Sequence, residues 1–163
     1  MHAWSFLKYW LPVLIWLGFI FIGSTDLMSA EHTSRFLIPF LLWLKPDFSP
    51  EALAQVHFVL RKLGHVTEYA ILAMLLWRAL RHETNPQIKA ILRLRSGQTL
   101  FLSVWILCAI FAATDEFHQS FVPSRGAAWS DVMIDSAGAI FGLLLYARFG
   151  PESSAIRNRK SPI

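Results

Sequence analysis

The chain has 163 residues, of which 55% are hydrophobic and only 16% are charged, and its formal net charge is +4. Soluble domains carry about a quarter charged residues, so this composition argues against a water-soluble domain and predicts a lipid bilayer as partner. Nucleic-acid binding is not expected, because Lys and Arg lie at the ends of apolar segments and are not interleaved with exposed aromatic residues. The only cysteine is Cys108, so an intrachain disulfide is impossible.

Four apolar stretches approach the length that a membrane-spanning helix needs, which is roughly 20 residues for about 30 Å of hydrocarbon. The sequence therefore predicts an all-α polytopic membrane protein built as a four-helix transmembrane bundle. The first stretch is interpreted as a retained helix, because its apolar run is long for a signal peptide. The predicted helices are 5–22, 58–80, 100–117 and 132–149.

A fifth apolar patch, residues 36–44, is too short to span the membrane and is closed by Pro46. It is expected to lie as a short segment at the interface or to re-enter between helices, and the sequence does not separate these two placements. Residues 1–150 are predicted to form one domain. The polar and basic tail, residues 151–163, is predicted to be disordered.

The orientation of the predicted bundle follows from its basic residues. By the positive-inside rule, connections rich in Lys and Arg face the cytoplasm. Both termini are therefore predicted to lie in the cytoplasm and the protein in the plasma membrane, with connections 23–57 and 118–131 outside. Arg61 and Lys62 oppose this weakly. The basic residues that carry the prediction are Arg81, Lys89, Arg93 and Arg95 in the second connection, and Arg157, Arg159 and Lys160 in the tail.

Ionisable residues within the predicted spans are unusual, because each costs about 2.5–3.5 kcal/mol at mid-bilayer. They occur here in groups whose spacings of three and four place them on common helix faces. The predicted topology brings all of these groups, and residues 23–26, to the outer side of the membrane. They are His65, Glu68 and Tyr69 on the second helix, Asp115, Glu116, His118 and Gln119 on the third, Arg125 in the loop, and Asp131 and Asp135 on the fourth.

This polar cluster has two possible interpretations. The residues could simply bond one another and hold the helices together, but five carboxylates, two histidines and an arginine exceed what a packing network needs, so a functional site is favoured. On the fourth helix, Gly138 and Gly142 form a small-xxx-small pattern, which predicts a close approach of a neighbouring helix and an inward-facing aspartate face.

Two chemistries fit the cluster and remain open. Histidines and carboxylates at a spacing of three could hold a divalent metal. Without a metal, His65 or His118 would act as general acid or base, and Arg125 would hold the phosphate or carboxylate of a lipid-linked substrate. The catalytic candidates are His65, Glu68, Asp115, Glu116, His118 and Gln119, and the substrate-binding candidates are Arg125, Tyr69, Asp131 and Asp135.

The motifs His65-x-x-Glu68-Tyr69, Asp115-Glu116-x-His118-Gln119 and Pro123-x-Arg125, followed by Asp131, together resemble the VanZ-like membrane proteins. The resemblance covers Trp10 to about Leu145. It implies a bacterial, four-helix, multi-pass protein of the cytoplasmic membrane, and the family's namesake is associated with low-level resistance to the glycopeptide teicoplanin. It implies no particular reaction. The chain departs from the family pattern at Ser124, where Gly is usual, and at Asp135, near a usual Asn.

Three functions follow as expectations. The first is an enzyme or an envelope-modifying factor that acts on a lipid-linked or otherwise anionic envelope molecule. The sequence does not decide whether the protein is an enzyme. The second is a non-catalytic protein that binds or senses an envelope ligand. The third is a small proton-coupled transporter, which ranks last because four helices are few for alternating access unless the protein dimerises.

Overall fold

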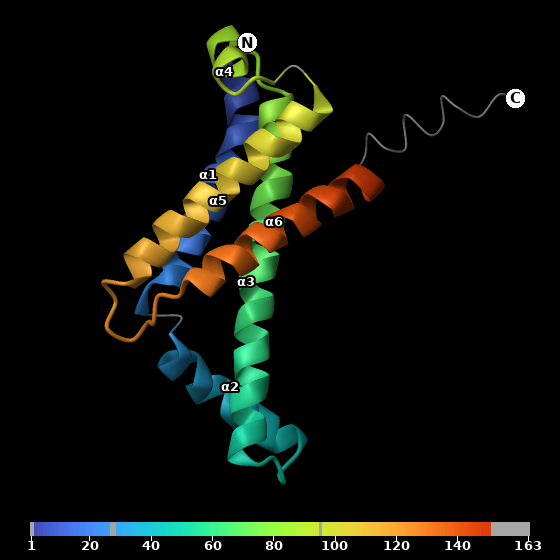
Figure 1. Ribbon diagram of the computed structural model, residues 1–163. Coiled ribbons are helices and arrows are strands. Elements are labelled where there is room, and N and C mark those ends of the chain that lie inside the picture. The colour runs from blue at the N-terminus through green and yellow to red at the C-terminus, as the bar shows by residue number, and fades with distance from the viewer. Residues whose placement is uncertain (1, 27–28, 95, 151–163) are drawn as a thin grey trace, which may run out of the picture.

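A computed structural model describes residues 2–26, 29–94 and 96–150, and within these ranges the regular structure is entirely helical (Figure 1). The predicted disordered tail, 151–163, lies outside the described residues. The helices, in chain order, are α1 (His2–Ser24), α2 (Ala30–Leu44), α3 (Pro50–Arg81), α4 (Pro86–Ile91), α5 (Gly97–Gln119) and α6 (Trp129–Phe149).

The long helix α3 is the centre of the structure. It begins earlier than the predicted residue 58, because the Ser49 hydroxyl accepts a hydrogen bond from the Ala52 amide and Pro50 occupies the first turn, both of which favour a helix start. Its 32 residues extend about 48 Å at a rise of about 1.5 Å each. Figure 1 shows α1, α5 and α6 around its C-terminal half, whereas α2 packs against its N-terminal half.

The apolar patch 36–44 forms the larger part of α2. This helix starts at an N-cap, Ser29, whose hydroxyl accepts a hydrogen bond from the His32 amide. Phe36, Phe40 and Trp43 are exposed on its surface. The patch is therefore the apolar C-terminal part of a helix that lies beside α3, with much of its apolar surface exposed.

Among the described residues, three helices are long and apolar enough to cross a membrane: Phe6–Ser24, Gly97–Gln119 and Trp129–Phe149. These segments lie in α1, α5 and α6 and correspond to three of the four predicted spans. The fourth prediction, 58–80, lies within α3, whose apolar run is interrupted by His65, Glu68 and Arg78. The structure therefore supports a helical membrane protein with three such helices and does not establish a fourth span.

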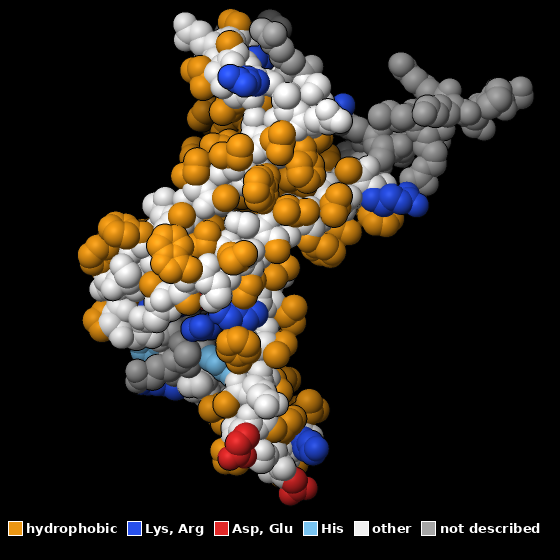
Figure 2. Space-filling model, in the orientation of Figure 1, with side chains coloured by type: hydrophobic (Ala, Val, Ile, Leu, Met, Phe, Trp, Pro, Cys, Tyr) orange, Lys and Arg blue, Asp and Glu red, His pale blue; other side chains and the backbone are white. Residues whose placement is uncertain are grey.

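The outward faces of these three helices are apolar. Phe19 on α1, Ile110 on α5 and Leu144 on α6 are all exposed, and Figure 2 shows hydrophobic side chains spread across the middle of the molecule, with Asp and Glu near the α2–α3 connection. A continuous exposed apolar surface is unfavourable in water and favourable against lipid tails. The distribution of side chains thus agrees with a bilayer environment.

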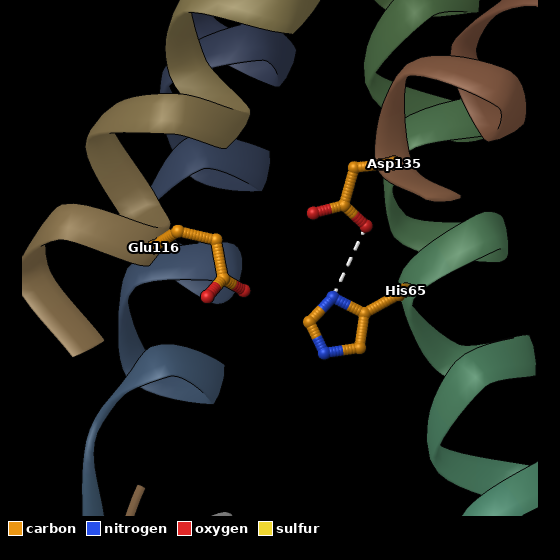
Figure 3. A group of neighbouring side chains, drawn as sticks. All are labelled: His65, Glu116 and Asp135. Carbon is orange, nitrogen blue, oxygen red and sulfur yellow. Dashed lines mark hydrogen bonds and ion pairs between the residues drawn. The ribbon is translucent and has the colours of Figure 1, made fainter. Parts of the chain in front are cut away.

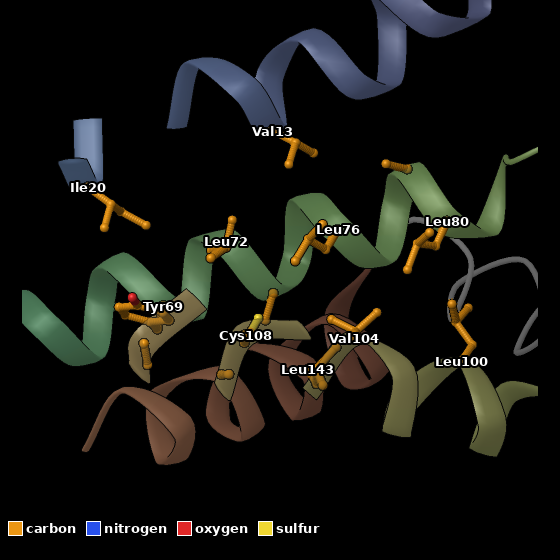
Figure 4. Packing of buried hydrophobic residues seen from close by; sticks show 14 residues of the cluster. Val13, Ile20, Tyr69, Leu72, Leu76, Leu80, Leu100, Val104, Cys108 and Leu143 are labelled. Atoms are coloured by element: carbon orange, nitrogen blue, oxygen red, sulfur yellow. The ribbon is translucent and has the colours of Figure 1, made fainter. Parts of the chain in front are cut away.

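The interior between the helices is a packed apolar core (Figure 4). Leu72 and Leu76 of α3 lie at its centre, Val104 and Cys108 reach it from α5, and Leu143 reaches it from α6. Cys108 is a free thiol that is fully buried. It therefore packs as a small apolar side chain.

The two glycines of α6 determine how closely α6 approaches α3. A Cβ atom on Gly138 would lie 2.6 Å from the carbonyl oxygen of Val66, and a Cβ atom on Gly142 would collide with the backbone of Ala70. The predicted close helix contact is therefore present, and its partner is α3. Because Val66 directly follows His65, this contact also brings the polar face of α3 to α6.

Candidate functional site

The helix ends that were predicted to meet do so. The C-terminal end of α1, the C-terminal end of α5 and the N-terminal end of α6 lie at one level beside the middle of α3 (Figure 1). A hydrogen bond of 3.1 Å between the Ser24 hydroxyl and Nδ1 of His118 joins the ends of α1 and α5. The polar groups of four helices therefore converge, with His65 in mid-helix and not at a helix start.

Three of the predicted residues form a buried triad: His65 from α3, Glu116 from α5 and Asp135 from α6 (Figure 3). One ligand atom from each lies within 4.8 Å of the others. The imidazole donates from Nδ1 to Oδ1 of Asp135 across 3.1 Å. The exposed fractions of the three residues are 7%, 5% and 0%, so the triad is shielded from solvent.

The two carboxylates of the triad are incompletely bonded. Oε2 of Glu116 accepts a hydrogen bond of 2.8 Å from the Ala128 amide. In the described part of the chain, Oε1 of Glu116 and Oδ2 of Asp135 are buried without a hydrogen-bond partner. Buried carboxylate oxygens are costly unless they are paired or bound to a metal. These oxygens, with a ring nitrogen of His65, are the atoms that could hold a divalent cation.

Asp131, one turn before Asp135, is neutralised separately. Its carboxylate forms an ion pair with the Lys62 ammonium, which also lies over the Phe58 ring at 5.2 Å. From the sequence, Lys62 was interpreted only as a basic residue that bears on the orientation in the membrane. Its spacing of three from His65 was the available signal that the two share a helix face.

Beside the triad, a cavity of about 630 Å³ opens between α1, α2 and α3. Its wall is mostly apolar on the side of α1, and polar where α3, α5 and the α5–α6 loop meet. At the α2–α3 contact it is mixed, because Leu37 and Leu60 lie there with Thr33 and His57, whose side chains are hydrogen-bonded at 3.1 Å. The apolar lining includes Trp16, Phe19, Ile20, Leu37 and Leu60, and the polar lining includes Arg61, His65, Glu68, Asp115, Gln119 and Arg125. His65 thus belongs to both the triad and the cavity.

Three further predicted residues stand along this cavity wall. Gln119 donates a hydrogen bond of 2.9 Å to Asp115, one turn earlier on α5. The Glu68 side chain lines the cavity, while its backbone carbonyl accepts a 2.9 Å hydrogen bond from the Trp16 indole. The sequence had singled out Glu68 as a neighbour of His65, whereas the hydrogen bond of His65 goes to Asp135.

Arg125 reaches from the α5–α6 loop to the end of α1. Its guanidinium donates to the backbone carbonyls of Thr25, at 3.1 and 3.3 Å, and of Gly23. These carbonyls lie at a helix C-terminus, where a cation is favourable. Burial lowers the pKa of the Arg125 guanidinium, the nearby Arg61 lowers it further, and Asp115 opposes this shift.

Besides Asp131, two predicted residues lie apart from the triad and the cavity lining. His118 contacts Ser24, and its ring centroid lies 4.9 Å from that of Phe21. Tyr69 is fully buried in the apolar core, where its hydroxyl has no hydrogen-bond partner within the described structure. Their sequence proximity to the other site residues did not reveal this separation.

Comparison with known proteins gives one match. The family model described as VanZ/LLP1 matches residues 9–150, a range that contains every residue of the triad and the cavity lining. No curated protein and no solved structure matches the chain.

Proposed function

Because this chain belongs to the VanZ/LLP1 family, we propose that it is a multi-pass protein of the bacterial plasma membrane that binds an anionic, lipid-linked envelope component in the cavity beside α3. The observation that carries the proposal is the composition of the cavity wall. One side offers Phe19, Leu37 and Leu60 to an apolar chain, and the other offers two guanidinium groups beside the carboxyl groups of Glu68 and Asp115. This is the complement of an amphiphile with a negatively charged head.

The size and chemistry of the cavity support this ligand class. Its volume of about 630 Å³ lies within the range of about 300–1,000 Å³ usual for ligand sites. Guanidinium groups match phosphate oxygens with paired hydrogen bonds. Arg125 directs some of its donors to the Gly23 and Thr25 carbonyls, and Arg61 adds a second guanidinium at the polar wall.

A reaction on the bound molecule is the form of this function that we favour. His65 lines the cavity and is held by a buried carboxylate of Asp135, an arrangement that orients an imidazole for general acid or base catalysis. Glu68 and Asp115 stand along the same wall. The resemblance to the family supplies no reaction, so the proposal names the ligand class and the acid–base group only.

A second candidate is a binding or sensing protein without catalysis. It is favoured by Arg125, which connects the cavity wall to the last carbonyls of α1. A ligand that drew the guanidinium toward its own phosphate would release the end of α1. In that case binding would persist after substitution of His65 and would depend on Arg125.

We further propose that α3 crosses the membrane as a fourth span, which completes the expected bundle. It is long enough, it contacts α1, α5 and α6, and its polar residues His65 and Glu68 face the protein interior or the cavity. Polar residues in a membrane are tolerated when they face the interior of a bundle. By the positive-inside rule, the basic connection with Arg81, Lys89 and Arg93 supports a cytoplasmic α4 and a cavity on the outer side.

The test of the ligand assignment is photocrosslinking in lipid nanodiscs. A photoreactive amino acid replaces Leu37, inside the cavity, or Leu144, which is exposed on the outer surface of α6. The probe is a long-chain isoprenyl phosphate, and the neutral isoprenol of equal length is the competitor. We expect a saturable adduct at residue 37 that isoprenol does not displace, and only non-saturable labelling at residue 144. Equal labelling at both positions would remove the proposal.

The family association with teicoplanin supplies an expected phenotype. If the bound component belongs to the pathway that the drug blocks, expression of the wild-type protein should raise the inhibitory concentration of teicoplanin in a susceptible bacterium. An Arg61→Ala variant of equal membrane abundance should not. An unchanged inhibitory concentration with the wild type would separate this chain from the resistance phenotype.

A further inference from the structure

The buried triad of His65, Glu116 and Asp135 carries an inference that does not depend on the lipid ligand. We propose that these three side chains bind a divalent transition-metal ion, with Zn²⁺ the ion whose ligand preferences they match best. The donors are one imidazole nitrogen and two carboxylate oxygens, each presented by a different helix. Imidazole and carboxylate are common Zn²⁺ ligands, and three protein ligands are typical of sites that keep one position open.

The spacing of the donor atoms fits such an ion with little rearrangement. Ligands at about 2.1 Å from a tetrahedral Zn²⁺ are about 3.4 Å from each other. The donor atoms of the triad already lie within 4.8 Å of one another, and Nδ1 of His65 is 3.1 Å from Oδ1 of Asp135. In Figure 3 the Glu116 carboxylate points from α5 toward the other two side chains. A small rotation of this flexible side chain closes the site.

The charge balance of the site calls for a cation. Glu116 and Asp135 are at least nine-tenths buried, and each has one carboxylate oxygen without a hydrogen-bond partner in the described structure. The Lys62 ammonium, three residues before His65 on α3, is already paired with Asp131. A divalent ion would neutralise both carboxylates while His65 stays neutral. Without the ion, an additional proton held between His65 and Asp135 would offset part of the carboxylate charge, and His65 would bind the ion as a neutral imidazole, so metal loading should release that proton.

The surroundings of the triad also resemble those of a metal centre. Ligating carboxylates are usually oriented by an outer hydrogen bond, and the Ala128 amide provides one to Glu116. The open position would lie on the side of His65, which is the triad residue that lines the cavity. An ion in the triad would therefore border the space in which the lipid head group is proposed to bind, and the acid–base role proposed for His65 would apply to the protein without the ion.

Metal uptake by the purified, tag-free protein in detergent tests the site directly. The protein is stripped with a chelator and titrated with Co²⁺, whose visible absorption reports low-coordinate binding, and Zn²⁺ then competes. We expect one Co²⁺ per chain, displaced by Zn²⁺, with proton release. Glu116→Gln and Asp135→Asn should each weaken uptake by at least about 100-fold, since loss of an outer partner alone costs about 10–100-fold.

The matched control is His82→Ala, because His82 lies at the far end of α3, stacked on Tyr9. This variant loses a histidine but should bind Co²⁺ like the wild type. If the stripped wild-type protein takes up no Co²⁺ or Zn²⁺ saturably, the proposal is wrong, whether or not any variant folds. It is also wrong if folded Glu116→Gln and Asp135→Asn both retain wild-type affinity. Lipid binding measured in the presence of the chelator tests the proposed function separately, so failure of the metal site and failure of the lipid site can be distinguished.

Discussion

The Nδ1 atom of His65 lies 3.1 Å from Oδ1 of Asp135, although the two residues are 70 positions apart in the chain. Both side chains are buried, one on α3 and the other on α6. The glycines of α6 make this contact possible, because Gly138 allows the backbone of α6 to meet the backbone of Val66. Helix packing and the polar site are thus properties of one interface.

Substitution of Gly142 tests this interface. Gly142→Ala places a Cβ against the Ala70 backbone, which has no flexible atoms that could move aside. We expect a loss of about 1–3 kcal/mol in stability, the usual cost of overpacking, measured as a lower unfolding temperature in detergent. The control is Gly18→Ala on α1, where a Cβ meets nothing within 4 Å. Equal stability of the two variants would contradict the close α3–α6 packing.

The ion pair of Lys62 with Asp131 makes a second prediction. Lys62→Met leaves a buried carboxylate unpaired and should cost about 3–5 kcal/mol, whereas the double variant Lys62→Met with Asp131→Asn should recover most of this loss. Lys89→Met, on exposed α4, serves as the control and should change little. Chemical unfolding of the wild type and these three variants measures the losses of stability. If the double variant is as unstable as the single one, Asp131 is not the partner of Lys62.

His118 is expected to stabilise the fold and not to contact the ligand. His118→Asn removes the hydrogen bond to Ser24, so we expect a loss of about 0.5–1.5 kcal/mol. Binding of an isoprenyl phosphate should stay at the wild-type level, because His118 lies outside the cavity lining. A large loss of isoprenyl phosphate binding in the folded variant would mean that His118 contributes to the binding site.

The proposed orientation can be tested by thiol labelling, because the native Cys108 is fully buried and should not react. Ser124→Cys lies in the α5–α6 loop and Asn85→Cys lies directly before α4. In intact cells a membrane-impermeant maleimide should label the first variant and not the second. Labelling of residue 85 alone would mean that the protein has the opposite orientation in the membrane. Labelling of both residues would mean that the two ends of α3 do not lie on opposite sides of the membrane.

Part of the site was predictable from local patterns. The spacing of Asp131 and Asp135 and the pattern of Gly138 and Gly142 predicted an inward, closely packed face on α6, and the burial of these residues confirms it. The helix patterns also located three helices that are apolar enough to span a membrane. These features depend on residues within one helix, which is why the sequence alone reveals them.

The remaining features depend on contacts between helices. The choice of Asp135 over Glu68 as partner of His65 follows from the register in which α6 crosses α3, which no local spacing encodes. The early start of α3 was not predicted, because Glu51, Gln55 and His57 interrupt the apolar pattern before residue 58. The cavity, likewise, exists only where α1, α2 and α3 come together.

The central claim, that the cavity binds an anionic lipid, is tested most directly by the affinity for a long-chain isoprenyl phosphate in nanodiscs. We predict saturable binding to the wild type, and weakening by about 10- to 100-fold in Arg61→Ala, because a hydrogen bond to a charged group contributes about 1.5–3 kcal/mol. Arg148→Ala, in the last turn of α6, should bind like the wild type. Equal affinity of the wild type for the phosphate and the neutral isoprenol would contradict the claim, as would an unchanged affinity in Arg61→Ala.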